Sequence, residues 1–196
     1  MLRGIVVLLC RKCLLHVRAK ITYIQKRTLV YFRRYTTGNH NVNRIIVRLL
    51  LFFVLNFGAL ALGSYLMGEG PMGSWYMNLN KAPWTPPGWV FGASWTLIMV
   101  CLSIFMNKAV QIGALSKTIL WIYGVQLVLN ILWNPLFFDL HWMGIALIEI
   151  ILLVFVVGFM AIKAKPYLPQ LTWLLTPYVV WLSIAITLNA YALQNN

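Results

Sequence analysis

The stretch that decides the fold is residues 142–162, WMGIALIEIILLVFVVGFMAI, in which Glu149 is the one charged residue. An α-helix rises about 1.5 Å per residue, so about 20 apolar residues cross the hydrocarbon core of a bilayer. A helix that is apolar on every side is buried in a large core or spans a membrane. The stretch therefore predicts a transmembrane helix.

Four further stretches predict transmembrane helices for the same reason: residues 45–67, 88–106, 118–138 and 169–193. The composition agrees, because 61% of the 196 residues are hydrophobic, three are acidic and the mean hydropathy is +0.79. A soluble domain of this size does not have such a composition. We therefore expect an all-α integral membrane protein in which residues 44–196 form a five-transmembrane-helix bundle. Pro177 lies inside the last stretch and should kink that helix.

Residues 1–43 form a basic N-terminal extension without any Asp or Glu, and eleven of the sixteen basic residues lie between Arg3 and Arg48. The net charge of +13 could suggest nucleic acid as a partner. A basic tail beside membrane spans instead indicates topology, targeting or contact with anionic lipid. Two interpretations stay open: a targeting-like segment, as in mitochondrial presequences or surface amphipathic helices, or an artefact of an over-long gene model.

The charges of the loops predict the orientation in the membrane. The loops on the side of the basic tail carry Lys108, Lys117, Lys163 and Lys165. The loops on the other side carry Lys81, Glu69 and Asp139. The positive-inside rule then places the N-terminus inside and the C-terminus outside. The membrane itself, a bacterial envelope or a mitochondrial outer membrane, stays open.

Polar and aromatic residues recur at helical spacing within three of the predicted spans: Trp95 and Thr96; Tyr123, Gln126, Asn130, Trp133 and Phe137; Tyr178, Trp181, Ala185 and Asn189. Residues three and four apart share a helix face, and polar groups in a membrane face the bundle interior or a cavity. One interpretation is hydrogen bonding of the amides between helices, with the tryptophans in interfacial belts. The other is an aromatic ligand cavity with a few amide groups. Spacing alone favours the first.

Glu149 is the one acidic residue within a predicted span. Carboxylates inside membranes commonly mark proton or ion pathways, which would suit a proton-coupled small carrier. The interpretation that we prefer is a neutral carboxyl group, hydrogen-bonded to a neighbouring amide or hydroxyl.

Two further patterns concern metals and helix contacts. Cys10, Cys13 and His16 lack the fourth ligand of a tetrahedral site, so we expect no metal and no required cofactor. Small residues allow helices to approach closely, as at Ala59 and Gly63 and at the GxxxG of Gly88 and Gly92. For the GxxxG, a homodimer is one interpretation, and the local geometry of the preceding prolines is the other.

Residues 75–95, WYMNLNKAPWTPPGWVFGASW, resemble the signature of the TspO/translocator protein family, also called peripheral-type benzodiazepine receptors. Residues 126–138, QLVLNILWNPLFF, support the resemblance, as do residues 177–181 and the pair at 188–189. The resemblance covers residues 45–196. It implies a five-helix bundle, often dimeric, that binds porphyrin, haem or hydrophobic drug-like molecules in a cavity closed by the first loop.

By motif position, the residues expected at that cavity are Trp75, Tyr76, Trp95, Asn130 and Trp133, and the last span adds Asn189. The resemblance therefore favours the ligand cavity over purely structural amides. Flat tetrapyrroles stack on Trp and Tyr rings, while amides orient their polar edges. The expected function is binding of tetrapyrroles or other hydrophobic, lipid-like ligands for sensing, sequestration or transport, with membrane lipid as the other partner.

The resemblance also implies an alternative, a porphyrin-degrading enzyme that depends on light and oxygen, with Trp95 as the redox-active residue. One of the family's pocket tryptophans lies in the last helix, where this chain has Ala190, so we expect binding or transport rather than catalysis. The family's sterol-associated motif needs a Lys or Arg after its tyrosine. Here Tyr191 is followed only by ALQNN, so we do not expect sterol binding there.

Overall fold

The computed structural model describes residues 42–196, and all the predictions that concern residues 1–41, including Cys10, Cys13 and His16, lie outside them. The first helix comprises residues 42–66. The elements that follow are η1 (Gly70–Met72), α2 (Ser74–Asn78), α3 (Gly88–Ala109), α4 (Gly113–Asn134), η2 (Pro135–Asp139), α5 (Met143–Ala164), η3 (Thr172–Leu175) and α6 (Thr176–Asn195).

The predicted fold class is confirmed. Five helices of the described chain are long and apolar enough to cross a membrane: Val42–Met72, Gly88–Ala109, Gly113–Asp139, Met143–Ala164 and Thr172–Asn195. Each of them overlaps one of the stretches predicted from the sequence. The protein is therefore a multi-pass membrane protein whose described residues contain helices and loops and no strand.

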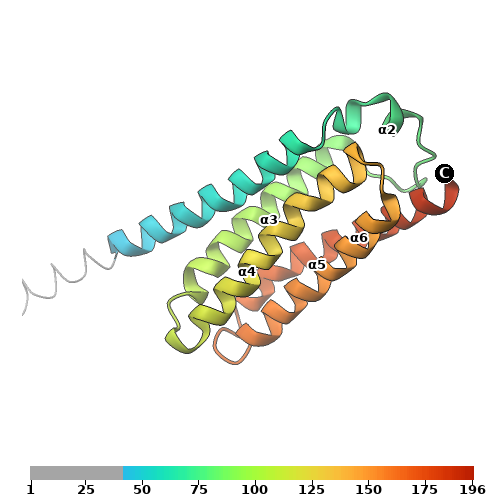
Figure 1. Ribbon diagram of the computed structural model, residues 1–196. Coiled ribbons are helices and arrows are strands. Elements are labelled where there is room, and N and C mark those ends of the chain that lie inside the picture. The colour runs from blue at the N-terminus through green and yellow to red at the C-terminus, as the bar shows by residue number, and fades with distance from the viewer. Residues whose placement is uncertain (1–41) are drawn as a thin grey trace, which may run out of the picture. The chain divides into compact units, whose positions relative to one another are not determined.

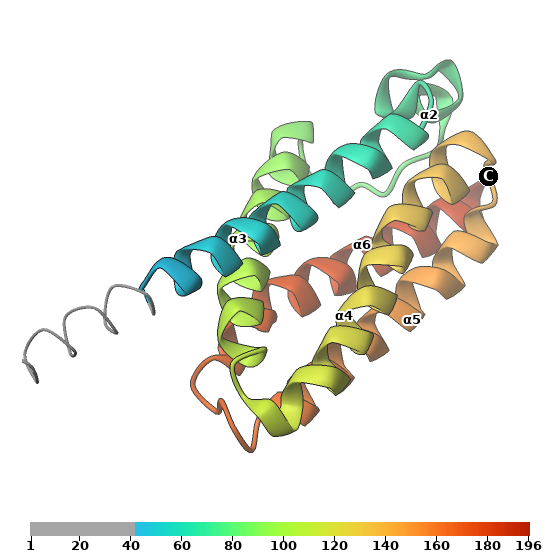
Figure 2. The same cartoon turned by 60° about the vertical axis from the view of Figure 1, so that its left-hand side comes forward.

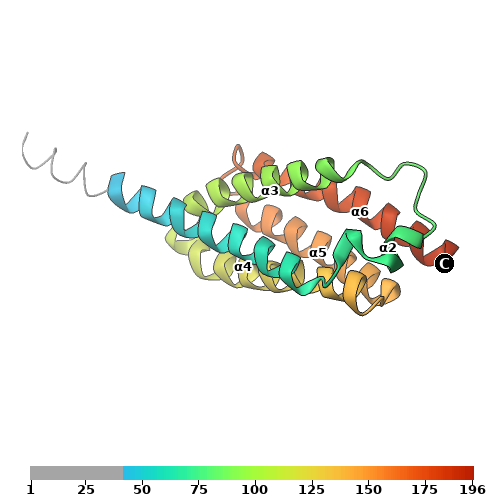
Figure 3. The same ribbon diagram turned by 90° about the horizontal axis from the view of Figure 1, so that it is seen from above.

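Residues 48–196 form one compact unit. Within it α5 packs against both α4 and α6, while α3 packs against α6 and η3. Figures 1 and 2 show α4, α5 and α6 side by side, and Figure 3 shows α3 next to α6. The short loops, such as that between α3 and α4, explain why successive helices run in opposite directions.

The bundle is most tightly packed towards the end where α3 finishes and α4 begins. The fully buried side chains there include Phe105, Met106, Ile119 and Met160, each 0% exposed. Towards the other end of the bundle, a second and smaller cluster surrounds Phe137, and it is here that the cavities lie.

Buried polar side chains connect the first helix to its neighbours. Asn56 donates through Nδ2 to Ser103 Oγ of α3 at 2.8 Å, and it accepts from the Tyr123 hydroxyl of α4 at 2.8 Å. In a bilayer such bonds stabilise the association of helices by roughly 0.6 kcal/mol each. Tyr123 belongs to the stripe of polar and aromatic residues identified in the third predicted span, whereas Asn56 and Ser103 were not predicted.

Small residues bring the first helix close to α4, as predicted for Ala59 and Gly63. Ala59 is buried, and a Cβ atom at Gly63 would lie 2.6 Å from Asn134 Nδ2. By contrast, Gly88 and Gly92 have nothing within 4 Å of the position of a Cβ atom, so their GxxxG makes no close contact within the described chain.

The kink predicted at Pro177 is wrong. The last span begins with the 3-10 helix η3, and α6 starts at Thr176, so that Pro177 lies in its first turn. The first turn of a helix has free N–H groups in any case, so a proline there removes no hydrogen bond and its fixed φ suits the helix. Pro177 therefore starts α6 and does not bend it.

Candidate functional site

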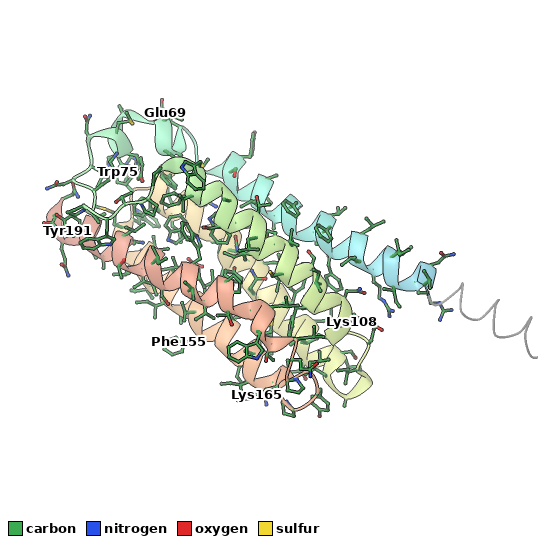
Figure 4. The ribbon with its side chains drawn as sticks, turned by 180° about the vertical axis from the view of Figure 1, so that it is seen from behind. Glu69, Trp75, Lys108, Phe155, Lys165 and Tyr191 are labelled. Atoms are coloured by element: carbon green, nitrogen blue, oxygen red, sulfur yellow. The ribbon has the colours of Figure 1, made fainter. Side chains whose placement is uncertain are left out.

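Residues 67–87 connect the first helix to α3 and form a cap over one end of the bundle, with η1 and α2 inside it. The chain turns sharply after the first helix because Gly68 and Gly70 adopt positive φ angles of 60° and 54°. Figure 4 shows Glu69 and Trp75 of the cap at the same end as Tyr191 of α6, while Lys108 and Lys165 lie at the opposite end. The cap is thus at the end away from Lys108 and Lys165.

Aromatic contacts hold α2 of the cap on the bundle. The Tyr76 ring lies 5.2 Å from that of Phe138, and the Trp75 ring stacks on His141 at 4.0 Å. Lys81 Nζ lies 4.5 Å from the centre of the Tyr76 ring, a cation–π contact. Burial raises the pKa of the Tyr76 phenol, so the hydroxyl stays neutral at physiological pH.

Few hydrogen bonds tie the cap to α6, and they are exposed. The Trp84 indole donates to Thr187 Oγ1 at 3.3 Å, and the backbone N–H of Asn80 donates to Asn196 Oδ1 at 2.9 Å. Exposed bonds of this kind contribute little, because water replaces them readily. The cap can therefore lift without breaking a buried polar network.

A π-helical turn, η2, shapes the wall below the cap. Pro135 has no N–H to continue the α-helical pattern, and the Leu140 N–H instead bonds to the Pro135 carbonyl at 2.9 Å. Phe137 and Phe138 then both contact the Trp133 ring, at 5.1 Å and 5.8 Å between ring centres. These three rings form an aromatic cluster beneath Tyr76.

The cap cavity lies between the cap and helices α3, α4 and α6, and has a volume of about 50 Å³. Its walls are largely aromatic and aliphatic, with Asn189 and Lys81 among the few polar residues. It is lined by Tyr76, Leu79, Lys81, Ala82, Thr85, Phe91, Trp133, Phe137, Phe138, Ala185, Leu188, Asn189 and Ala192.

The inner cavity, of about 30 Å³, is lined by Phe91, Trp95, Asn130, Trp133, Ile150, Leu153, Trp181, Leu182 and Ala185. Three residues, Phe91, Trp133 and Ala185, line both cavities. They form the partition between the two spaces, so movement of the Phe91 and Trp133 side chains would join them.

Hydrogen-bonding capacity remains unused at the inner cavity. Asn130 Nδ2 and Gln126 Nε2 both donate to the Tyr178 hydroxyl, at 2.6 Å and 2.7 Å, so the Asn130 amide nitrogen is occupied. The Asn130 carbonyl oxygen accepts no hydrogen bond from the described residues. The indole N–H of Trp133 is buried and also has no partner there. One acceptor and one donor are thus left for a ligand.

Asn189 has a different role, because both of its polar atoms face the backbone of α5. In the amide orientation that satisfies both atoms, Nδ2 donates to the Met143 carbonyl at 3.0 Å and Oδ1 accepts from the Leu147 N–H at 3.2 Å. Asn189 therefore joins α6 to α5 and contributes shape rather than free polar groups to the cap cavity.

The six residues expected at the site fall into three groups. Trp95, Asn130 and Trp133 meet at the inner cavity, and Trp133 also lines the cap cavity with Tyr76 and Asn189. Trp75 lines neither cavity, since it packs on His141 and Phe137.

Phe91 was not predicted, although it lies one turn before Trp95 on α3 and so shares its face. That spacing is the signal that could have found it. Trp181 and Ala185 lie on the polar and aromatic stripe that was identified in the last span, and both line the inner cavity.

Glu149 lies outside both cavities. It is 6% exposed, and neither of its carboxyl oxygens has a hydrogen-bond partner among the described residues. The hydrogen bond predicted to a neighbouring amide or hydroxyl is therefore wrong. The amide nitrogens of Gln126 and Asn130 on α4 donate instead to the Tyr178 hydroxyl.

Known proteins match nearly all of the bundle. The model of the TspO/MBR family matches residues 50–194. A tryptophan-rich sensory protein of Cereibacter sphaeroides is 33% identical over 125 residues, which cover 62% of this chain and 77% of that protein. The translocator protein of Ovis aries is 34% identical over 138 residues, 67% of this chain and 79% of the relative. The translocator protein of Homo sapiens is 32% identical over 137 residues, with the same shares of 67% and 79%. Because the family model matches most of the chain and five of its helices can span a membrane, the chain belongs to the TspO/MBR family of membrane proteins.

Proposed function

We propose that this protein binds a porphyrin, haem or another hydrophobic, lipid-like ligand in the space formed by the cap cavity and the inner cavity together. The ligand would be held for sensing, sequestration or transport. Rings from α2, α3, α4 and α6 surround this space, and aromatic pairs favour stacked or edge-on contacts with a flat ligand.

The size of the cavities requires a change of shape on binding. Sites for small molecules usually enclose about 300–1,000 Å³. The two cavities, at about 50 and 30 Å³, are far smaller. Binding would therefore rotate Phe91 and Trp133 out of the partition and lift the cap, which a few exposed hydrogen bonds and the contacts of Tyr76 hold in place.

The observation that carries the proposal is the unpaired indole N–H of Trp133. A buried donor without a partner costs about 1–3 kcal/mol, and a ligand that offers an acceptor recovers that cost. The carboxylate edge of a porphyrin is such an acceptor. A pyrrole N–H, in turn, is a donor for the free carbonyl oxygen of Asn130.

The test is a titration of the purified protein with protoporphyrin, followed by quenching of tryptophan fluorescence. Trp133→Phe keeps an aromatic ring and removes the N–H, and we expect it to weaken binding by about 5- to 140-fold, which corresponds to the 1–3 kcal/mol that pairing of the buried donor recovers. Trp173→Phe is the matched control, because Trp173 is 74% exposed and lines neither cavity.

The results separate the proposal from its alternatives. If Trp133→Phe and Trp95→Ala both titrate like the parent protein, the ligand does not occupy these cavities. If Trp173→Phe weakens binding as much as Trp133→Phe, the ligand lies at the other end of the bundle, and the proposal is wrong.

The orientation that we propose with this function places the N-terminus inside and the C-terminus outside. It is supported by four lysines at the ends of helices away from the cap: Lys108 near the end of α3, Lys117 in the first turns of α4, Lys163 near the end of α5 and Lys165 just after it. The cap would then admit ligand from the outer side of a bacterial envelope or mitochondrial outer membrane. An epitope after Asn196 should be accessible to antibody in intact cells or organelles, and protection of that epitope would reverse the assignment.

A further inference from the structure

A groove runs along the outer face of α4 and α5, away from both cavities. It has a volume of about 420 Å³ and is lined entirely by apolar side chains. Its floor includes Ile122 and Val156, which are less exposed, while its walls are the projecting rings of Trp121 and Phe155, 79% and 69% exposed. Figure 4 shows Phe155 pointing away from the bundle.

Two lysines lie at one end of the groove. Lys163 Nζ is 5.1 Å from the centre of the Phe159 ring, which lines the groove. Lys117 lies one turn before Trp121, on the same face of α4, because residues four apart are neighbours on a helix. Both lysines are exposed. The apolar groove thus has two exposed cationic side chains, Lys117 and Lys163, at one of its ends.

No carboxylate of the described chain neutralises this end. The three acidic residues of the sequence are Glu69 in the cap, Asp139 in η2 and Glu149, which is buried within α5. Glu69 and Asp139 lie at the capped end of the bundle, which is the end opposite Lys117 and Lys163. The positive charge beside the groove is therefore available to an external anion.

We propose that the groove binds one anionic phospholipid, with an acyl chain along Ile122 and Val156 and the phosphate between Lys117 and Lys163. Charge complementarity selects this occupant. Basic sites between transmembrane helices bind anionic headgroups, and each lysine near such a surface strengthens binding by about fivefold. A second copy of the chain seated on the same face would bring four lysines together without an acidic partner, which is unfavourable.

The site is independent of the proposed tetrapyrrole function. None of the residues that line the groove lines the cap cavity or the inner cavity. Loss of porphyrin binding would therefore leave the lipid site intact, and loss of lipid selectivity would leave porphyrin binding intact.

Trp121 is the natural reporter, since it projects into the groove. The parent protein and Trp121→Phe are reconstituted in phosphatidylcholine vesicles with a minor, constant fraction of phosphatidylglycerol, and either lipid carries bromine on its acyl chains. Bromine quenches indole fluorescence on contact, so the difference between the two proteins gives the quenching of Trp121. We expect brominated phosphatidylglycerol to quench Trp121 several-fold more, per mole of brominated lipid, than brominated phosphatidylcholine.

Charge variants test the headgroup contact. Lys117→Gln and Lys163→Gln should each lower the preference for phosphatidylglycerol by about fivefold. Lys108→Gln is the matched control, because it removes an exposed lysine at the same end, from α3, without touching the groove. Val125→Phe, which narrows the groove and leaves the charge unchanged, should also abolish the preference.

Three results would overturn the proposal. Equal quenching of Trp121 by both brominated lipids would make the groove an ordinary lipid-facing surface. Absence of quenching by either lipid would mean that protein, such as a second copy, covers it. An effect of Lys108→Gln as large as that of Lys163→Gln would assign the preference to the overall charge of this end of the bundle.

Discussion

The hydroxyl of Tyr178 is the point at which α4 and α6 are joined by hydrogen bonds, and its removal is the sharpest test of the packing. It accepts from Gln126 Nε2 at 2.7 Å and from Asn130 Nδ2 at 2.6 Å. The three side chains are 1%, 0% and 4% exposed, so no water replaces the lost acceptor. Tyr178→Phe removes the oxygen and keeps the ring, which packs edge-on against Trp95 at 5.9 Å.

The magnitude follows from the two bonds that are lost. Hydrogen bonds between transmembrane helices contribute roughly 0.6 kcal/mol on average and up to about 1.7 kcal/mol. Two such bonds are therefore worth about 1–3 kcal/mol. Because both amides stay buried without an acceptor, we expect the free energy of unfolding to fall by an amount in this range.

The assay is unfolding in mixed micelles by increasing sodium dodecyl sulfate, followed by loss of helical circular dichroism. Tyr167→Phe is the control, because Tyr167 is 50% exposed and its hydroxyl forms no hydrogen bond with the described residues. A double-mutant cycle of Tyr178→Phe with Gln126→Leu should show a coupling energy of about 0.5 kcal/mol or more. If Tyr178→Phe costs no more than Tyr167→Phe, or if the two changes are additive, the inferred bonds do not stabilise the protein.

Three further predictions concern helix contact, the buried carboxyl and the cap. Gly63→Leu should destabilise the bundle by about 1–3 kcal/mol, since even a Cβ atom there would meet Asn134 at 2.6 Å, whereas Gly58→Leu, with open space around it, should change stability little in the same unfolding assay. Glu149→Gln should leave porphyrin affinity within about twofold of the parent, because the carboxyl lies outside both cavities, and a tenfold loss in the titration would place it in the site. Burial raises the pKa of Tyr76 above its ordinary 10.0, so the docked cap retains the phenol proton more tightly than the lifted cap. The contribution of this proton to docking is complete below the ordinary pKa and is lost as pH rises through the raised pKa of the docked cap. Hydrogen exchange of the cap should therefore accelerate at alkaline pH in the parent and not in Tyr76→Phe.

Much of the candidate site could be predicted from residue spacing and the signature motif. Trp95, Asn130 and Trp133 lie at the inner cavity as expected, because spacing of three or four residues puts side chains on one helix face. Tyr76 lines the cap cavity but the adjacent Trp75 does not, because neighbouring side chains on the short helix α2 point in different directions. Its partner His141 is 66 positions away, and no local pattern indicates such a contact.

Other features depended on contacts that the sequence does not display. The amides of Gln126 and Asn130 could have bonded to any neighbour, and only the packing of α6 against α4 brings Tyr178 between them. Glu149 was expected to form a hydrogen bond, but neither of its carboxyl oxygens has a partner among the described residues. Pro177 starts α6 because η3 ends the loop before it, and that depends on how η3 packs against α3.

The sequence by itself determined that this protein crosses a bilayer five times, because the length of an apolar stretch is set by the thickness of the hydrocarbon core and is a local property of the chain. Only the tertiary structure decided which of the nine tryptophans face a cavity and which face lipid. Tryptophan is tolerated on both the lipid-facing and the interior faces of such helices, so which face each tryptophan takes is set by close packing and a few hydrogen bonds between helices.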